Sequence, residues 1–328
     1  MESQRLVSLG WFDHGNCGDE AFKEALLRLF PAYEIVFINS IPKNLSLINE
    51  SAALIIGGGN IVDAGFLRGL EKVSVPYHFI GIGVLEKSNL DLLRGASTLI
   101  VRDVQSLEIV SNAYPDVILA PDITFILSPD KHNPISGLDS KKLTVGVFLN
   151  DCVSANFESS ILKFIECEKV KLELARFLES LSYNVIFIPF SMTPPDDRRI
   201  SLDVIGKMKK GYKYPCVTQP ILTCDYLALV SSLDFGISMR LHADIFCTIA
   251  GVPFIDLLHH DKNKGYLQTI GEPGLGLDFY ELSFRNLREK FAFLEANKKE
   301  ISARLLQKAA QNKSQLERLT QNVHLSPK

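Results

Sequence analysis

The sequence predicts an α/β protein with two Rossmann-like domains, each built on a parallel sheet. Short apolar runs rich in valine, isoleucine and phenylalanine alternate with amphipathic stretches along most of the chain, a pattern typical of parallel strands joined by helices. The chain has 328 residues, whereas a single domain usually holds about 100 to 200. A polar segment at residues 128–142, which contains two prolines, interrupts the apolar runs and predicts the domain boundary.

The apolar runs place the elements in order along the chain. Strands are expected at residues 5–10, 34–39, 53–56, 78–83, 98–102 and 117–120, then at 143–149, 184–190, 235–238 and 253–257, with helices near 159–180 and 223–232. Residues 284–319 carry apolar side chains at helical spacing. They predict one or two helices that pack on the protein body, a membrane-surface helix being the minority alternative. The predicted domains are 1–130 and 141–283, followed by a helical segment at 284–328.

The composition excludes several classes of protein. An apolar fraction of 46% and a charged fraction of 22% are typical of globular rather than disordered or fibrous chains. The net charge of -3 leaves no broad positive surface for a nucleic acid. We see no signal-like N-terminal segment and no apolar run of about 20 residues, and therefore expect a cytoplasmic protein with at most peripheral membrane contact. The six cysteines lack zinc-binding spacing and are expected to be reduced thiols.

The first strand leads into a glycine-containing loop, Trp-Phe-Asp-His-Gly-Asn-Cys-Gly-Asp-Glu at residues 11–20, and a helix predicted from Ala21. Glycines let the backbone approach a ligand, and free N–H groups at a helix start favour an anion or a hydroxyl-rich group. The spacing matches neither the dinucleotide nor the P-loop pattern. The structural alternative is that Asp19 caps the helix and the glycines turn the chain.

The third strand ends in a second glycine run, Gly57-Gly58-Gly59-Asn60, with Asp63 close behind. Ligands bind at the carboxyl ends of strands in open parallel sheets. We therefore expect this run and the first loop on one side of one cleft. A tight turn with close helix packing is the alternative.

Arg102 stands at the end of the fifth strand, where a buried charge requires a partner. Asp103 or another acid pairs with it structurally, or the arginine reaches a ligand. Both interpretations are open at this point.

The most specific stretch is Phe-Gly-Ile-Ser-Met-Arg-Leu-His-Ala-Asp at residues 235–244, a strand that leads into a helix predicted from Ala243. In an extended chain Arg240 and His242 share a face while Leu241 packs inward. A guanidinium binds carboxylate or phosphate through two hydrogen bonds, and histidine can donate a proton near neutral pH. A lone histidine is, however, more often structural than catalytic.

Two cationic groups at one strand end need an acidic partner, and Asp244 is the nearest candidate. After the next strand, residues 259–264 read His-His-Asp-Lys-Asn-Lys. They are expected to form a solvated loop without metal-ligand spacing, in which Lys262 or Lys264 adds a third positive group.

Taken in order, these stretches resemble the polysaccharide pyruvyl transferase family. The matching residues are 15–20, 57–60, Val101-Arg102-Asp103 with Ser106, and Arg240-Leu241-His242-Ala243 followed by 251–255. The resemblance covers most of the chain, although only the Arg-Leu-His stretch is specific alone, and Cys17 stands where an aliphatic residue is expected. It implies a GT-B-like α/β fold, in which two Rossmann-like domains face each other across a cleft. The acceptor would lie on the N-terminal side and the donor on the C-terminal side.

The resemblance further implies an enzyme that transfers the pyruvyl group of phosphoenolpyruvate onto two hydroxyls of a saccharide as a ketal, in cell-surface polysaccharide biosynthesis. With the patterns above, it assigns His242 and Arg240 as catalytic residues. The donor-binding residues are then Arg102, Arg240, Leu241, His242 and Lys262, and the acceptor-binding residues Asp13, Asn16, Asp19, Gly58, Gly59, Asn60 and Asp63. His242 is either a general acid or a phosphate contact, and Asp13, Asp19 or Asp63 accepts a hydroxyl proton. The mechanism requires no cofactor and no metal. Lipid-linked and nucleotide-linked acceptors are both open.

Two other functions fit the same patterns. A GT-B glycosyltransferase would use a nucleotide sugar and hold its ribose with an acid of the second domain, for which Asp256 is the candidate. The third interpretation is an anion-binding or scaffold protein without catalytic activity.

Overall fold

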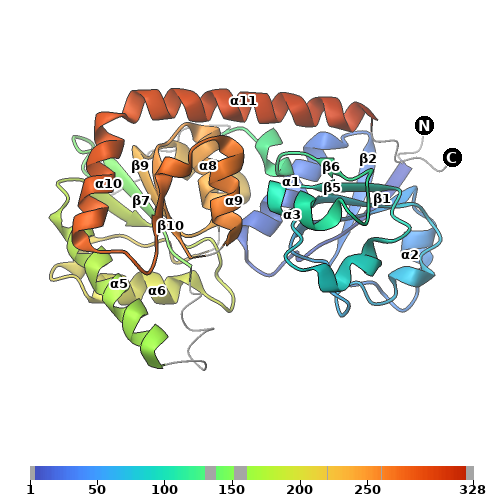
Figure 1. Cartoon of the computed structure of the whole chain (residues 1–328), viewed down its shortest axis with the longest axis horizontal. Coiled ribbons are helices and arrows are strands. Elements are labelled where there is room, and N and C mark those ends of the chain that lie inside the picture. The colour runs from blue at the N-terminus through green and yellow to red at the C-terminus, as the bar shows by residue number, and fades with distance from the viewer. Residues whose placement is uncertain (1–3, 130–137, 151–160, 220, 260, 323–328) are drawn as a thin grey trace. The chain divides into compact units, whose positions relative to one another are not determined.

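The computed structural model describes residues 4–129, 138–150, 161–219, 221–259 and 261–322 (Figure 1). The chain forms two compact units. Unit 1 comprises Met1–His14, Gly18–Leu127 and Ala310–Lys328, and unit 2 comprises Gly15–Cys17 and Ser128–Ala309. Each unit contains one parallel sheet, as the sequence predicts.

The sheet of unit 1 has six parallel strands in the order β2-β1-β3-β4-β5-β6. The strands are β1 (Gln4–Leu9), β2 (Tyr33–Ile38), β3 (Ala53–Gly59), β4 (Tyr77–Ile82), β5 (Thr98–Val101) and β6 (Ile118–Leu119). The helices are α1 (Cys17–Leu29), α2 (Ser46–Asn49) and α3 (Val104–Val110), with short 3-10 helices η1 (Leu70–Lys72), η2 (Lys87–Leu93) and η3 (Ile123–Ile126). All six predicted strands are present, and β3 continues through the second glycine run.

The glycines of β3 let α1 pack closely on the sheet. A Cβ atom on Gly57 would lie 2.2 Å from the carbonyl oxygen of Ile80 and 2.4 Å from the Phe22 ring. Gly58 has a positive φ of 82° and also lies against Phe22. Only glycine fits such a backbone with so little space above it. Close helix packing, the structural alternative for this run, therefore accounts for Gly57 and Gly58.

The sheet of unit 2 has five parallel strands in the order β11-β10-β9-β7-β8. They are β7 (Thr144–Phe148), β8 (Asn184–Phe187), β9 (Phe235–Ser238), β10 (Phe254–Leu258) and β11 (Gly276–Asp278). The helices are α5 (Ile161–Ser180), α6 (Asp197–Gly206), α7 (Thr223–Ser231), α8 (Leu241–Ala250), α9 (Asp261–Ile270) and α10 (Phe284–Ala296), with 3-10 helices η4 (Gly211–Lys213) and η5 (Pro273–Leu275). Helices cover both faces of this sheet (Figure 1): α5 packs with α6 and α10, and α8 packs with α7 and α9.

Among the described strands and α-helices of unit 2, β11, α6 and α9 were not predicted, and one prediction is wrong. Strand β11 is only three residues long, helix α6 follows a Pro-Pro pair, and α9 is rich in polar residues. The stretch after β10 was expected to be a solvated loop, but α9 begins at Asp261 and Asn263 is completely buried. The buried Asn263 makes side-chain hydrogen bonds that compensate for its desolvation. His260 lies outside the described residues.

The predicted C-terminal helices are α10 and α11 (Lys298–Asn322), and their apolar side chains pack on the protein as expected. The residues at helical spacing are all at most 2% exposed: Leu287, Phe291, Leu294, Ile301, Leu305 and Leu316. Such burial is typical of an amphipathic helix that faces a protein core. Among the described helices, none is both long and apolar enough to cross a membrane.

The described cysteines are free, and charged side chains are dispersed. Cys17, Cys167, Cys216, Cys224 and Cys247 form no disulfide.

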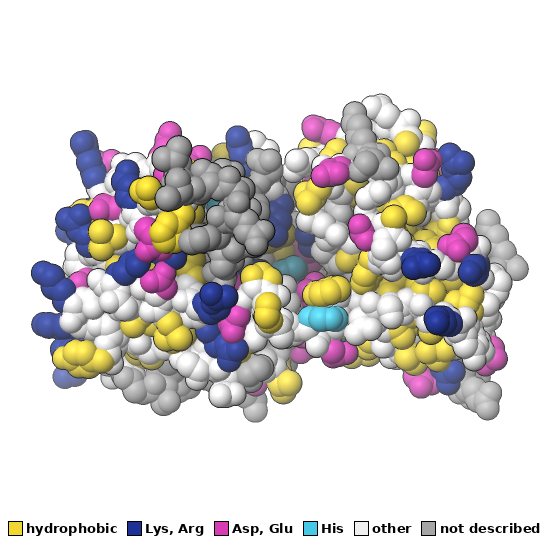
Figure 2. Space-filling view, turned by 90° about the horizontal axis from the view of Figure 1, so that it is seen from below, with side chains coloured by type: hydrophobic (Ala, Val, Ile, Leu, Met, Phe, Trp, Pro, Cys, Tyr) yellow, Lys and Arg dark blue, Asp and Glu magenta, His cyan; other side chains and the backbone are white. Residues whose placement is uncertain are grey.

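Figure 2 shows side chains of both charge signs interspersed with hydrophobic and uncharged ones on the face that it presents. An anionic ligand would therefore depend on a local arrangement of donors rather than on a wide positive field.

Candidate functional site

Arg240, two residues after the end of β9, is held by a buried carboxylate of another element. Its Nε donates to Asp197 Oδ2 at 2.8 Å, and its Nη2 donates to Oδ1 of the same side chain. Asp197 is the first residue of α6 and is completely buried, whereas the Arg240 side chain is 16% exposed. The prediction that Asp244 is the acidic partner of Arg240 is therefore wrong. The sequence suggested a neighbour along the chain, but the acid that reaches Arg240 follows β8, which is separated from β9 by β7 in the sheet.

Asp197 also fixes the segment that follows β8. Its Oδ2 accepts the backbone N–H groups of Phe190 and Ser191, at 3.2 and 2.9 Å. The carboxylate thus receives hydrogen bonds from Arg240 and from two backbone donors, which compensate for the loss of water around a buried charge. The sequence signal that could have revealed it is an acidic residue just after a Pro-Pro turn at a strand end.

The same segment binds the first glycine loop. Cys17 N donates to Phe190 O at 2.8 Å, Met192 N donates to Gly15 O at 3.0 Å, and Asn16 forms a β-bridge with Ser191. Gly15 has a φ of 65°, and a Cβ atom there would lie 3.1 Å from Thr193. Residues 15–17 of the loop and Arg240 are therefore connected through the segment after β8 and through Asp197.

His242 lies in the first turn of α8. The helix begins at Leu241, not at Ala243, and β9 ends at Ser238, so Arg240 and His242 do not alternate along one extended strand as predicted. The turn between them is fixed by Ser238, whose Oγ accepts from Arg240 N at 3.0 Å and donates to Arg240 O at 3.1 Å. Leu241 is buried, as expected, while His242 is half-buried. The N–H groups of the first turn give this end of α8 a positive potential.

A buried carboxyl pair lies beneath this turn. Asp244, Asp256 and Asn263 are completely buried, and Asn263 Nδ2 donates to Asp244 Oδ2 at 3.1 Å and to Asp256 Oδ1 at 3.2 Å. Burial, followed by the charge of Asp256, raises the pKa of Asp244 well above its usual value. Burial also raises the pKa of Asp256, to about 7. Two close carboxyls in an apolar interior favour retention of a proton.

The ends of β7 and β10 contribute a histidine that sequence reasoning missed. His259 Nδ1 donates to Leu257 O at 3.3 Å, and its Nε2 accepts from Asn150 Nδ2 at 3.2 Å. Both residues follow apolar strands, which is the signal that could have identified them. Lys262 is half-buried in the first turn of α9. The carboxyl edge of the unit 2 sheet thus carries Asn150, Arg240 and His259, each one or two residues after the end of a strand.

Unit 1 has a small polar cavity at the carboxyl ends of β3 and β4. Its volume is about 240 Å³, and it is lined by Asn60, Val62, Asp63, Gly83, Val84, Leu85, Glu86 and Asn89. Two of the predicted acceptor-binding residues, Asn60 and Asp63, therefore line one cavity. Asp63 Oδ1 also accepts the N–H groups of Gly65 and Phe66, at 2.8 and 3.0 Å, so this carboxylate caps a turn as well.

Asp13 and Asp19 lie on either side of the point where α1 starts. Asp13 Oδ1 accepts from Lys23 Nζ at 2.7 Å, and the Asp13 N–H donates to Glu20 Oε1 at 2.7 Å. Asp19 is in the first turn of α1 and is 9% exposed, where a carboxylate is favoured by the helix dipole. Gly59, the last predicted residue of the acceptor group, ends β3, and a Cβ atom there would lie 3.8 Å from Asp19 Oδ1.

Arg102 forms a buried ion pair in unit 1. Its Nη1 lies 3.1 Å from Asp122 Oδ2, and the two side chains are 5% and 7% exposed. Asp103 has a different role: it caps α3 by accepting the Ser106 N–H at 2.7 Å. Of the two interpretations left open for Arg102, the structure therefore shows the ion pair with another acid. A direct donor contact of Arg102 stays a prediction.

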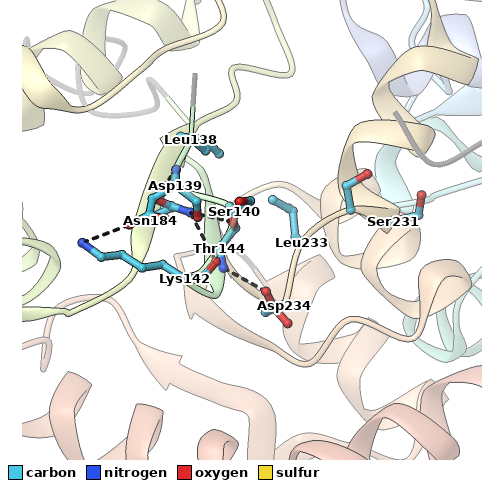
Figure 3. Close-up of a pocket in the computed structure, with 10 residues that line it drawn as sticks. Leu138, Asp139, Ser140, Lys142, Thr144, Asn184, Ser231, Leu233 and Asp234 are labelled. Atoms are coloured by element: carbon cyan, nitrogen blue, oxygen red, sulfur yellow. Dashed lines mark hydrogen bonds and ion pairs between the residues drawn. The ribbon is translucent and has the colours of Figure 1, made fainter. Parts of the chain in front are cut away.

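A larger hollow of about 520 Å³ lies at the opposite, amino edge of the unit 2 sheet (Figure 3). Several of its polar groups bind one another. Asn184 Nδ2 donates to Asp139 O at 2.8 Å, and Asp234 Oδ2 accepts from Thr144 N at 2.9 Å. Ligands of parallel sheets bind at the carboxyl edge, so we do not assign the functional site to this hollow.

Two units that each carry a parallel sheet, with polar residues at the carboxyl edges, define an α/β protein of the GT-B-like class. The fold is similar to that of a glycosyltransferase from Rickettsia africae, at 10% identity over 98% of both chains with a TM-score of 0.62. It is also similar to Anabaena HepE in complex with UDP and glucose, at 10% identity over 97% of this chain and 98% of that one with a TM-score of 0.61. A third is S. aureus MnaA with UDP, at 9% identity over 93% and 91% with a TM-score of 0.61.

The chain belongs to the polysaccharide pyruvyl transferase family, whose sequence model matches residues 16–261. This match confirms the resemblance carried by the glycine loops and the Arg-Leu-His stretch. The family name implies a transferase with a pyruvyl donor and a saccharide acceptor. No curated protein sequence matches the chain.

Proposed function

We propose that the protein transfers the pyruvyl group of phosphoenolpyruvate onto two hydroxyls of a saccharide as a ketal, in the biosynthesis of a cell-surface polysaccharide. The observation that carries this proposal is the arrangement at the start of α8. Arg240 is oriented there by the buried Asp197, two residues before the half-buried His242. Together with family membership, it supports a donor site at the carboxyl edge of the unit 2 sheet.

The donor is a small anion with a phosphate and a carboxylate, and Arg240 suits it. Two N–H groups of the guanidinium go to Asp197, and Nη1 forms no hydrogen bond to a described residue. Nη1 can thus donate to a phosphate or carboxylate oxygen of the donor. The first turn of α8, with Leu241 and His242, adds backbone donors and the positive end of the helix dipole. Lys262 in α9 supplies a further positive charge in the same unit.

The reaction needs a proton at C3 of the enol, a clamp for the phosphate and a path for two hydroxyl protons. Protonation of C3 by His242 generates an oxocarbenium-like centre at C2, and the first saccharide hydroxyl adds to C2 with loss of its proton. The second hydroxyl then forms its bond to C2 and gives up its proton to the departing phosphate while the C2–O bond to phosphate breaks, and inorganic phosphate leaves. A positioned general acid typically contributes about 10² to 10⁴ in rate. In the alternative role, His242 binds the departing phosphate.

The acceptor side is proposed for unit 1. The cavity at the ends of β3 and β4 offers Asn60, Asp63, Glu86 and Asn89, and amide and carboxylate groups are suited to sugar hydroxyls. Asp63 is exposed and can accept a hydroxyl proton. Asp13 can do the same once its hydrogen bond from Lys23 is broken. Gly58 and Gly59 contribute to this side through the shape of the second glycine run, and Asn16, which is grouped with unit 2, stays a proposed acceptor contact.

The nucleotide-sugar alternative is less well supported. Its candidate for the ribose contact, Asp256, is completely buried against Asp244 and Asn263. A buried carboxyl with a raised pKa is not available to a ribose at the surface. The solved structures that contain UDP establish the fold alone at their 9 to 10% identity.

The test combines ligand binding with phosphate release. Thermal shift with phosphoenolpyruvate should stabilise the full chain, by about 2.7 kcal/mol at 100 times the dissociation constant, whereas UDP and GDP should not. Phosphorus NMR with a panel of glycans should then show phosphate release that depends on a glycan. His242→Ala should reduce that release by about 10² to 10⁴ while the melting temperature changes little.

Stabilisation by a nucleotide and not by phosphoenolpyruvate would favour the glycosyltransferase. Loss of the folded state in His242→Ala would mean that the histidine is structural. A matched control is Tyr212→Ala, because Tyr212 is 85% exposed in η4, which contributes no residue to the proposed donor or acceptor side, and should leave phosphate release unchanged.

A further inference from the structure

Trp11 is an exposed aromatic residue at the carboxyl edge of the unit 1 sheet. It is the only tryptophan of the chain and is 48% exposed, two residues after the end of β1. A large aromatic side chain that remains in water at the ligand-binding edge of a parallel sheet is a candidate contact for a partly apolar ligand. None of the roles assigned above uses it.

The indole is part of a small aromatic platform formed by Trp11, His14 and Phe66. The Trp11 and His14 rings are stacked, with centroids 3.9 Å apart and an angle of 17° between their planes. The Phe66 ring is tilted by 50° at a centroid distance of 6.4 Å. His14 supports the indole from one side, so the orientation of the indole is defined while almost half of its surface stays accessible.

The loop that carries the platform is held by the protein itself. Asp13 has a positive φ of 60°, which is unusual for a residue other than glycine. Its N–H is bound by Glu20 and its carboxylate by Lys23, each at 2.7 Å. His14 Nδ1 donates to Phe12 O within the same turn. Such a turn persists only when its surroundings determine it, and strained turns of this kind cluster at ligand sites.

The platform adjoins the polar cavity of unit 1. Phe66 donates its N–H to Asp63 Oδ1 at 3.0 Å, and Asp63 lines the cavity with Asn60, Glu86 and Asn89. An aromatic face is therefore combined with amide and carboxylate groups. That combination matches a pyranose ring, because one of its faces presents mainly C–H groups while its edge presents hydroxyls. The C–H groups carry a slight positive charge and are attracted to the negative face of an indole.

We propose that Trp11, supported by His14, stacks on the C–H face of a pyranose ring of the acceptor, whose hydroxyls bind in the adjoining cavity. This inference rests on the proposed function, since it concerns the same acceptor, and it narrows the substrate class to sugars with an unhindered C–H face. Trp11 is then a specificity-determining residue that contacts the acceptor and not the donor.

The test is saturation-transfer NMR with the full chain and two probes, methyl β-D-galactopyranoside and methyl α-D-mannopyranoside. At least one probe should receive saturation at the protons of one ring face, and the emission of the single tryptophan should shift as that probe saturates the protein. Trp11→Ala should weaken the transfer by about tenfold, the loss of roughly one aromatic contact. Trp11→Phe should retain most of it, and Tyr212→Ala should change nothing.

Equal transfer in wild type and Trp11→Ala, or no transfer from either probe to the wild type, would overturn the inference. Circular dichroism checks that the Trp11→Ala variant is folded. If Trp11→Ala is unfolded, the saturation transfer measured with Trp11→Phe tests the inference instead. The outcome is separable from that of the proposed function. If the protein binds a pyranoside but releases no phosphate in the presence of a glycan, only the transferase proposal is contradicted. If Trp11→Ala releases phosphate at the wild-type rate, only the proposed role of the aromatic platform is contradicted.

Discussion

Asp197 is 43 residues from Arg240 in sequence, yet its carboxylate accepts from the Arg240 side chain and from two backbone N–H groups. This changes how Arg240 must be tested. Truncation to alanine would leave a buried, unpaired carboxylate, and breaking a buried pair in this way costs about 3 to 5 kcal/mol. A loss of activity in Arg240→Ala would therefore not separate a donor contact from a loss of the fold.

We expect Arg240→Lys to separate the two. Lysine keeps the positive charge beside Asp197 but cannot form two parallel hydrogen bonds to it and also present a third donor to a ligand. Phosphate release should fall by about 10- to 10²-fold, since a hydrogen bond to a charged group contributes about 1.5 to 3 kcal/mol, while most of the stability is retained. The comparison is between phosphate release and the melting temperature. Activity close to that of the wild type would exclude Arg240 from the donor site.

The buried carboxyl pair predicts a dependence of stability on pH. An aspartate in the unfolded chain loses its proton near pH 3.9, whereas burial raises the pKa of Asp256 in the folded protein to about 7. Between these values the folded protein binds more protons than the unfolded chain, so this group's contribution to stability decreases as the pH rises. Above the folded pKa, Asp256 carries a charge in a site from which water is excluded.

Asp256→Asn should therefore raise the melting temperature at pH 8, by about 2 to 4 °C for each kcal/mol of charge burial that the substitution removes. At pH 4 the same substitution should leave the melting temperature nearly unchanged. The amide retains the shape of the side chain and supplies a donor toward Asp244. Glu289→Gln is the matched control, because Glu289 is exposed in a surface pair with Arg285. A variant whose melting temperature shifts equally at both pH values would show that the carboxyl is not protonated in the folded protein.

At the scale of elements, the second glycine run illustrates how one pattern serves two purposes. Its glycines allow α1 to pack on β3 through Phe22, and the strand then ends beside Asn60 at the polar cavity. Tight packing under the helix thereby fixes the edge of the cavity. The sequence indicated both uses but not how they divide among the glycines.

Gly57→Ala should destabilise the protein by about 1 to 3 kcal/mol, as overpacking does, because the added Cβ would lie 2.2 Å from the carbonyl oxygen of Ile80. Gly265→Ala is the opposite case. Gly265 lies in α9 with nothing within 4 Å of an added Cβ, so the variant should gain about 0.5 to 1 kcal/mol of stability. Denaturant unfolding monitored by circular dichroism measures both. Equal effects of the two variants would contradict the packing described for β3.

Strands and helices with strong apolar periodicity could be predicted from the sequence, and weakly apolar elements could not. Every predicted strand has its counterpart, because buried parallel strands are nearly continuous runs of valine, isoleucine, leucine and phenylalanine. Helix α9 was missed since only part of it faces the core and its buried polar residue, Asn263, looks like a surface residue in sequence. The helix before it, α8, was placed two residues late because Arg240 and His242 obscured its start.

At the scale of the whole molecule, the family and the fold class were accessible from the sequence, whereas the pairings within the site were not. The glycine loops and the Arg-Leu-His stretch lie far apart in sequence, but the family model spans them, since it matches residues 16–261. Which acid meets which arginine depends on the arrangement of the strands in space: Asp122 follows β6, the neighbour of the strand before Arg102, whereas Asp197 follows β8, which β7 separates from the strand before Arg240. Such long-range pairs leave no periodic signal in a single sequence.

The path of α11 has a practical consequence for dissection of the protein. This single helix starts in unit 2 and ends in unit 1, and Leu316, near its end, is completely buried. A fragment that stops at residue 127 would lack the last stretch of unit 1 and expose the apolar surface that this leucine covers. Expression of an isolated N-terminal half should therefore include residues 310–328, fused through a short linker or supplied as a separate peptide.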